Sequence, residues 1–371
     1  MEPKPLYKQA HSLSHTALHA AHNALGAKMV DFHGWYMPLH YGSQLQEHQQ
    51  VRQHTGLFDV SHMTIIDILG SGARSFLRHL LTADMDKLPN TGRALYSCMC
   101  NDQGGVIDDL IVYQRTSSLY RIILNSATRT RDLAWIREQV KAYKVDIHER
   151  ADLAMIAIQG PNAISQSLSV LTTTVADAVS KLEAFAYIEL EDLFIARTGY
   201  TGEDGLEIIA PPAHIISLWQ ALINTGIQPC GLAARDTLRI EAGLLLYGQD
   251  MDESITPLES SLGWTIAWDP TDRDFIGRKS LESQREQGTH HRLVGITLQG
   301  KGMLRSGQRV IIEGFPDGII TSGTFSPILG QSIGFARVPR ETPDTVEVEI
   351  RDKHLYATVG NIKFIKKGHA S

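Results

Sequence analysis

The last quarter of the chain constrains the fold most, because its pattern fits a small all-β domain. From residue 288 onward, short runs rich in β-branched and aromatic residues alternate with turn residues: RLVGITL, QRVIIEG, GIITSG, SIGFARV, TVEVEIR and HLYATVG. Short strands separated at close intervals by turns predict a β-barrel or a β-sandwich. The polar stretch 285–291 marks the start of this domain.

The preceding residues mix helices and strands differently. The helical spacing of apolar residues predicts helices at 71–81, 131–143, 214–226 and 234–248. β-rich runs that end at turn residues predict strands at 118–125 and 151–160. These elements lack the regular alternation of a doubly wound parallel sheet. A chain of 371 residues is also too long for one ordinary core, so two or three domains of α+β character are expected.

Composition excludes several classes of protein. A hydrophobic content of 43% with 20% charged residues is typical of a globular chain. A net charge of -6, with no dense block of Lys or Arg, argues against a nucleic-acid partner. No run approaches the ~20 apolar residues of a membrane span, and the N-terminus lacks the apolar core of a signal peptide. We therefore expect a cytoplasmic protein without a membrane partner; a processed organelle protein would show the same features.

Cysteine and histidine usage predicts no metal site. Cys98, Cys100 and Cys230 are too few for a disulfide framework or a four-ligand zinc site, and free thiols suit a reducing compartment. Residues 1–15 are interpreted as an N-terminal extension. The histidines there and just beyond recur in steps that place them on one helix face, which predicts an exposed stripe rather than metal ligands: His11, His15, His19 and His22.

Familiar catalytic motifs are absent from the sequence. No Gly-rich loop ends in Gly-Lys-Ser/Thr, and no nucleophile elbow or HExxH is present. The segment GSGARS (70–75) resembles a dinucleotide-binding loop only loosely, because no acidic residue follows in the right context. ATP, NAD and FAD are therefore not expected as ligands.

Four other stretches carry candidate chemistry: 29–43, 104–113, 197–208 and 230–253. The first is rich in aromatics and holds His33 and His40, while the second places Asp108 and Asp109 inside an apolar run. Each stretch alone fits a turn or a surface ion pair. Together they supply carboxylates, an arginine and aromatics without a metal set or nucleophile. Such groups suit a planar heterocycle with amide-like donors and acidic substituents.

At these stretches the sequence resembles the aminomethyltransferases, the T-proteins of the glycine cleavage system. The resemblance extends from Thr16 to the last strands, on blocks that match in order: MVDFHGWYMPLHY, GLFDVSHM, GGVIDDLIVY, IQGPNA, RTGYTGEDGLE, CGLAARDTLRIEAGLLLYGQDMDE, DFIGR and GIITSGTFSPILG. It implies a three-lobed α+β folate-binding fold. Two interleaved α+β lobes would occupy residues 16–287, and a β-barrel domain would occupy 288–371.

The resemblance also implies a reaction. Members of the family take the aminomethyl group carried on the lipoyl arm of H-protein and transfer its one-carbon unit to tetrahydrofolate, the co-substrate. The products are ammonia, 5,10-methylenetetrahydrofolate and dihydrolipoyl H-protein. The P- and L-proteins of the glycine cleavage system would be functional partners.

Site residues are carried over from the family one by one. The second acid of the family's DDL pair falls on Asp109, its catalytic carboxylate. Strand alternation then places Asp108 on the opposite face, as a structural cap or turn acceptor. Carboxylates have an ordinary pKa of about 4, which favours orientation and electrostatics over proton transfer as the role of Asp109. The remaining residues are implied to lie near the folate: Glu207, Arg235, Tyr200, Tyr96, Tyr113 and Asn125.

Some features depart from the family pattern. Both TALHAAHNALGAKM (16–29) and KPLYKQAH (4–11) resemble the family's opening block, Leu244 lies where some relatives carry an aromatic residue, and the C-terminus lacks the tyrosine of others. Alternatives within the fold are folate-dependent tRNA-modification factors, which carry Lys-Gly-Cys-Tyr where this chain has LLLYGQDMDE, demethylases, and fused sarcosine or dimethylglycine oxidases, which need a flavin domain. A non-catalytic folate-binding protein would lack the acid at Asp109.

Overall fold

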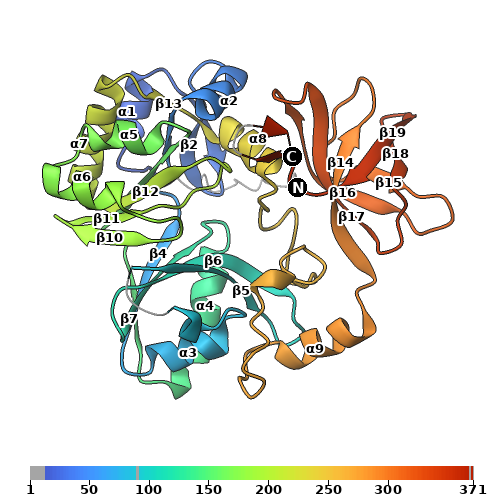
Figure 1. Cartoon of the computed structure of the whole chain (residues 1–371), viewed down its shortest axis with the longest axis horizontal. Coiled ribbons are helices and arrows are strands. Elements are labelled where there is room, and N and C mark those ends of the chain that lie inside the picture. Colours follow the sequence, from blue (N-terminus) through green and yellow to red (C-terminus); the bar gives the residue numbers. More distant parts are fainter. Residues whose placement is uncertain (1–12, 89–91, 367–368, 371) are drawn as a thin grey trace, which may run out of the picture.

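Three lobes surround a central region in the computed structural model, which describes residues 13–88, 92–366 and 369–370 (Figure 1). Two lobes each combine a mainly antiparallel sheet with helices, and the third is a closed six-stranded barrel. The predicted α+β class, three lobes and C-terminal barrel are confirmed. None of the helices in the described ranges is long and apolar enough to cross a membrane.

The first lobe is built on a six-stranded sheet. In sheet order its strands are β10 (Tyr187–Leu190), β11 (Leu193–Ala196), β12 (Gly205–Ala210), β9 (Ala154–Gln159), β3 (Gly56–Asp59) and β13 (Gln228–Pro229). Every residue of β9 is buried, which explains the unbroken apolar run in its sequence. One face packs against α1 (His19–Ala24), α5 (Ala163–Leu168), α6 (Thr173–Ser180) and α7 (Pro212–Asn224).

The second lobe is built on a five-stranded antiparallel sheet. In sheet order its strands are β5 (Ala94–Cys100), β6 (Val106–Gln114), β7 (Leu119–Leu124), β4 (Thr64–Leu69) and β8 (Asp146–Glu149). Its outer face is covered by α3 (Ala73–Leu80), α4 (Arg129–Gln139) and the short helices η1 (Met85–Lys87) and η2 (Val140–Ala142). Its other face meets the six-stranded sheet through a shared apolar layer that includes Ile123 and Met155.

The barrel contains all six strands predicted after residue 288. Its strands close in the order β14 (His291–Leu298), β17 (Gln331–Pro339), β16 (Gly318–Ser326), β15 (Arg309–Ile311), β18 (Thr345–Ile350) and β19 (Lys353–Gly360). Alternate side chains fill the interior, as the small-barrel pattern requires. Helix α9 (Arg278–Gln287) leads into the barrel, and the hairpin of β20 (Ile365–Lys366) and β21 (His369–Ala370) follows it.

The helix at the centre of the molecule is shorter than the sequence predicts. We predict a helix over 234–248, but α8 runs from Leu232 to Ala242. Gly243 ends it in the left-handed conformation, at φ 75°, which glycine adopts without steric cost. The chain after Gly243 leaves the helix axis and lines the central cavity described below. Helix α8 also packs against α2 (Gln44–Gln53), and η3 (Gly263–Thr265) lies farther along the chain.

The predicted histidine stripe is wrong. Helix α1 begins only at His19, so His15 precedes it and stacks on His19 at a ring distance of 3.9 Å. His22 is fully buried, and its Nε2 lies 2.9 Å from Asp59 Oδ2. Tertiary contacts therefore override the local helical spacing. His11, with residues 1–12 of the predicted extension, lies outside the described residues.

A buried ion pair joins α8 to the barrel. The Arg239 side chain is 1% exposed and donates to Asp250 Oδ2 at 2.6 Å and to Ser322 Oγ of β16 at 2.7 Å. Asp250 also accepts from the Thr321 hydroxyl at 2.5 Å. A buried pair with its remaining hydrogen-bonding positions filled fixes the barrel against the helix that contributes to the cavity.

Breaking this pair from one side should destabilise the protein strongly. Asp250→Ala leaves the buried Arg239 guanidinium without its buried carboxylate partner, although the half-exposed Asp236 still contacts its Nε at 3.0 Å; loss of one partner of a buried pair typically costs about 3–5 kcal/mol. The matched control is Glu138→Ala, which breaks the exposed Glu138–Lys141 pair and should cost under about 1 kcal/mol. Urea unfolding of both variants measures the difference, and equal losses would contradict the role assigned to Asp250.

Candidate functional site

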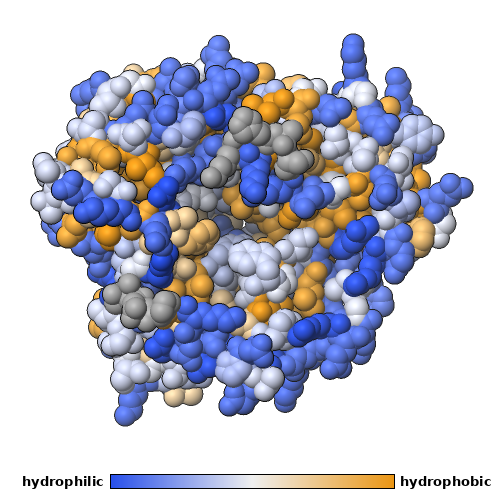
Figure 2. All heavy atoms as spheres, in the orientation of Figure 1, coloured by the Kyte–Doolittle hydropathy of each residue, from blue (hydrophilic) through white to orange (hydrophobic). Residues whose placement is uncertain are grey.

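A cavity of about 250 Å³ lies where the two sheets meet α8 and the loop after it. Figure 2 shows the surface hollowed near the centre of this face, where the lobes meet. All seven residues predicted from the sequence line this one cavity: Tyr96, Asp109, Tyr113, Asn125, Tyr200, Glu207 and Arg235. They come from β5, β6, the end of β7, the loop before β12, β12 itself and α8.

The two adjacent acids of β6 face different surroundings. The chain reverses at Gly104, whose φ of 83° suits glycine, and β6 then begins at Val106. Asp108 is 0% exposed, whereas Asp109 lines the cavity. Asp108 Oδ2 accepts from the Asn125 main-chain N–H at 3.1 Å, and its Oδ1 accepts from the Asn125 amide at 2.9 Å. Asp108 is thus a buried acceptor, as expected from the sequence.

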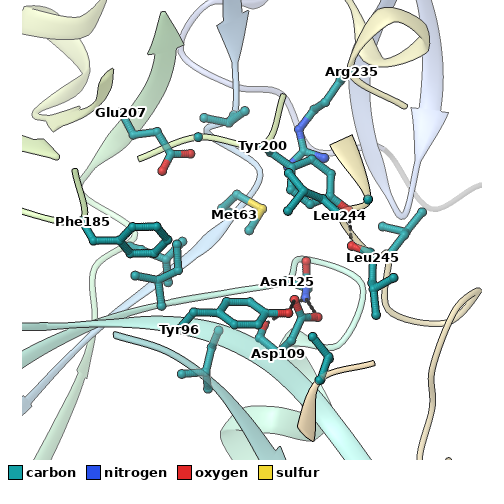
Figure 3. A pocket seen from close by; sticks show the side chains of 18 of the residues that line it. Met63, Tyr96, Asp109, Asn125, Phe185, Tyr200, Glu207, Arg235, Leu244 and Leu245 are labelled. Carbon is teal, nitrogen blue, oxygen red and sulfur yellow. Dashed lines mark hydrogen bonds between the residues drawn. The ribbon is translucent and has the colours of Figure 1, made fainter. Parts of the chain in front are cut away.

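Asp109 is held by donors from two directions. The Tyr96 hydroxyl donates to Asp109 Oδ2 at 2.8 Å, and the Asn125 amide donates to Oδ1 at 3.1 Å (Figure 3). Tyr96 on β5 is a diagonal cross-strand neighbour of Asp109, within reach of a long side chain. The carboxylate is therefore fixed in direction before any ligand binds.

The ordinary pKa assumed for Asp109 in the sequence analysis is wrong. Burial is the largest cause that raises the pKa of Asp109, and the neighbouring Asp108 carboxyl is the second; together they raise it to about 7. The hydrogen bonds from Tyr96 and Asn125 act in the opposite direction and do not offset burial. A carboxyl that titrates near neutrality can both accept a proton and carry charge at physiological pH.

Glu207 lies on the opposite wall of the cavity. It belongs to β12 and accepts from the Thr198 hydroxyl at 2.5 Å, and Tyr113 Oη lies 3.3 Å from the same hydroxyl. Burial raises the pKa of Glu207, because few groups compensate its charge. One carboxylate oxygen is occupied by Thr198, which leaves acceptor capacity directed into the cavity (Figure 3).

Arg235 enters the same space from α8. Its guanidinium lies 4.1 Å from the ring centroid of Tyr200, a cation–π contact, and donates no hydrogen bond to another residue in the described ranges. The Tyr200 hydroxyl donates to the Leu245 carbonyl, which ties the ring to the chain after α8. The planar donor group of Arg235 is thus oriented yet available for an acidic ligand.

Two rim aromatics were missed by sequence reasoning. Trp264 is 69% exposed and stacks on Tyr96 at a ring distance of 5.6 Å, and Phe185 is 48% exposed. Both line the cavity, as do Leu244 and Ile362. A large apolar side chain left exposed beside a cavity is a signal of ligand contact. Isolated aromatics in an irregular segment give no such signal in the sequence alone.

Other candidates from the sequence lie elsewhere. Residues 29–43 form mainly the hairpin of β1 (Lys28–Phe32) and β2 (Trp35–His40), and none of them lines the cavity. Glu203 pairs with Arg52 at 2.8 Å, and Asp204 pairs with Arg197 at 2.5 Å. Glu203 is thus held in a buried pair and Asp204 in a partly exposed one, and among the acids of this Gly-rich stretch only Glu207 lines the cavity.

Comparisons with known proteins agree with this architecture. Residues 18–270 match the GCVT N-terminal domain, and residues 291–366 match the glycine cleavage T-protein C-terminal barrel domain. The crystal structure of glycine cleavage system aminomethyltransferase T from Bartonella henselae superposes with a TM-score of 0.89 at 31% identity. That comparison covers 97% of this chain and 100% of the other.

Curated relatives give the same result at higher identity. An aminomethyltransferase of Legionella pneumophila (strain Paris) is 61% identical over 95% of this chain and 98% of its own length. One from Xylella fastidiosa (strain M23) is 54% identical over 95% and 97%. The chain belongs to the aminomethyltransferase family, the T-proteins of the glycine cleavage system. It is accordingly a transferase of a family that uses tetrahydrofolate as a substrate.

The raised pKa of Asp109 predicts a pH-dependent cost to folding. Below about pH 4 the carboxyl is protonated in both states; the cost develops as pH rises from about 4 to the folded-state value of about 7 and stays constant above it. Asp109→Asn cannot ionise, so its stability relative to wild type should grow by roughly 2 kcal/mol between about pH 5 and pH 8, after allowance for partial solvent screening.

Urea unfolding at the two pH values measures this difference. Asp146→Asn, at an exposed position of β8, is the control and should show no such growth. A pH-independent difference for Asp109→Asn would show that Asp109 has an ordinary pKa in the folded protein.

Proposed function

We propose that the central cavity binds tetrahydrofolate and that the one-carbon transfer takes place beside Asp109. The observation that carries this proposal is the convergence of two carboxyls and one arginine on a single cavity. Its described lining contains no Ser, Thr, Cys, Lys or His, so a serine, cysteine or lysine nucleophile is not among its groups. Such a site suits transfer between two bound substrates better than a covalent enzyme intermediate.

The binding roles follow from the chemistry of the folate. Glu207 is suited to accept N–H groups of the pterin, and Arg235 is suited to pair with a ligand carboxylate. The remaining predicted contacts, Tyr96, Tyr113, Tyr200 and Asn125, supply ring faces and polar groups around the ligand. Phe185 and Trp264 extend the aromatic lining to the rim.

Asp109 would act at the reaction centre in two ways. When the carbon–nitrogen bond of the aminomethyl group breaks and ammonia leaves, the carbon becomes electron-poor, and a fixed carboxylate stabilises that positive charge. Tetrahydrofolate supplies the two nitrogens that come to bridge the carbon. Those nitrogens lose two protons, one of which ends on the lipoyl sulfur and one on ammonia. A carboxyl with a pKa of about 7 can relay them.

The donor of the carbon would be the aminomethylated lipoyl arm of H-protein. The open rim at Phe185 and Trp264 gives an apolar entrance suited to an aliphatic arm. P- and L-proteins would act on H-protein in the other steps of glycine cleavage. We further propose residues 16–287 and 288–371 as the two domains, with residues 1–15 as an extension, and a cytoplasmic location without metal.

Removing either charged wall residue should weaken folate binding. Glu207→Ala or Arg235→Ala leaves a ligand group without its charged partner, which typically costs about 2–5 kcal/mol in a buried contact. Calorimetric titration with tetrahydrofolate measures this loss, with Glu138→Ala as the exposed-acid control. Wild-type affinity in a folded Glu207→Ala protein would exclude Glu207 from the binding site.

Asp109→Asn should separate binding from turnover. The amide keeps the shape of the side chain but removes its charge, so folate should bind nearly normally while ammonia release from aminomethylated H-protein falls roughly 10²-fold or more. Asp108→Asn should lose far less activity and mainly lower the stability. If Asp108→Asn is the inactive variant and Asp109→Asn keeps most activity, the two roles are reversed.

A further inference from the structure

Asp108 and Asp132 form a pair of buried carboxyls on the side of Asp109 that faces away from the cavity. Asp132 of α4 is 0% exposed, as is Asp108 of β6, and the two carboxyls interact electrostatically. Neither buried oxygen of Asp132 has a hydrogen-bond partner among the described residues, and the nearby Thr128 hydroxyl donates to the Asn125 carbonyl at 3.0 Å. A proton held between the two carboxyls satisfies both groups.

Electrostatic repulsion between Asp108 and Asp132 also favours a proton shared by the two carboxyls. Two carboxylates in contact inside a protein cannot both ionise near neutral pH. Burial raises the pKa of Asp108 well above its usual range, with the Asp132 charge as the second cause; burial likewise raises the pKa of Asp132 to about 6. Arg131 Nε lies 3.9 Å from Asp132 Oδ1 and favours charge at that end. The pair therefore carries one proton and one negative charge.

The Asn125 amide connects this pair to Asp109. Its Nδ2 lies 2.9 Å from Asp108 Oδ1, 3.1 Å from Asp109 Oδ1 and 3.2 Å from the Asp109 carbonyl oxygen. The main-chain N–H of Asn125 also donates to Asp108. Asp108 thus fixes both the backbone and the amide of the residue that holds Asp109.

We propose that Asp132 is a positioning residue for the transfer: it shares one proton with Asp108, and this pair sets the orientation and charge state of Asp109 through Asn125. The inference rests on the proposed role of Asp109 in turnover. The proposal predicts the sign of a pKa change, because a negative charge closer to Asp109 makes the ionisation of Asp109 less favourable. Loss of Asp132 removes one of the two causes that keep Asp108 protonated, and the two donors from Asn125 then favour the negative charge on Asp108, adjacent to Asp109.

The other charged and titratable groups around Asp108, Asp109 and Asp132 should not obscure a change in the pKa of Asp109. Burial raises the pKa of the neighbouring tyrosines and of the Cys98 thiol. These groups therefore stay neutral through the pH range in which the aspartates titrate. Glu253 pairs with Arg131 at 2.5 Å on the exposed side of α4. The groups that face the cluster are Tyr96, Cys98, Arg131, Tyr200, Tyr247 and Glu253, with Glu207 and Arg235 across the cavity.

The test is the pH profile of turnover for four proteins beside wild type. Ammonia release from aminomethylated H-protein with tetrahydrofolate is followed from about pH 5 to pH 9 for Asp132→Asn, Asp108→Asn, the double variant, and the control Glu138→Gln on the exposed face of α4. The acidic limb should move up by at least about half a pH unit in Asp132→Asn. It should return to the wild-type position or below it in the double variant, which lacks the Asp108 charge.

Three outcomes would overturn the proposal: an unmoved limb in Asp132→Asn, an equal shift in Glu138→Gln, or a shift that persists in the double variant. If wild type itself releases no ammonia, the proposed function fails instead, which keeps the two failures distinct. Should Asp132→Asn not fold, infrared difference spectra of Asp109→Asn against the Asp108→Asn/Asp109→Asn double variant at about pH 7.5 decide the matter, because neither protein carries the Asp109 carboxyl. A protonated-carboxyl band that is present in Asp109→Asn and lost in the double variant supports the shared proton. If Asp109→Asn shows no such band, the shared proton is refuted.

Discussion

The burial of charged side chains where the three lobes meet is the constraint that organises this molecule. A buried charge is tolerated when it is paired and hydrogen-bonded. Arg239 is neutralised by Asp250, and Arg52 by Glu241 and Glu203, so that these pairs join α8 to the barrel and to α2. The charged groups in these pairs have most of their hydrogen-bonding positions filled by one another.

The cavity is where this pairing is incomplete. Glu207 has one hydroxyl donor, and Arg235 has a ring face and no hydrogen-bond acceptor among the described residues. Asp109 has two donors but no cation in contact within the same ranges. The free energy left uncompensated at these groups appears as shifted pKa values, raised for both acids and lowered by burial for Arg235. A ligand with complementary charges would supply the missing partners, which is why stability and activity are expected to oppose each other at Asp109.

Short-range patterns predicted much of the fold. The six barrel strands were readable because turns at close intervals punctuate them, and β7 and β9 because their apolar runs are short and bounded. Tertiary contacts decided the rest. His22 is drawn into the core by Asp59, and Gly243 ends α8 where the apolar spacing of residues continues. The local sequence around Asp132 does not mark it, because the carboxyl with which it interacts, Asp108, belongs to another element, β6.

The identity of the acid that faces the cavity depends on a single irregularity in the sheet. Met99 pairs with Asp108 and Cys100 pairs with Val106, so Ile107 is an extra residue on β6 at that point. Without this bulge, pairing continued from Val106 would place Asp108 opposite Cys98, the position that Asp109 now occupies. Side chains alternate along a strand, so a one-residue shift exchanges the faces of the two acids. The bulge, formed just after the glycine turn, therefore determines which carboxyl faces the cavity and which is buried beside Asp132.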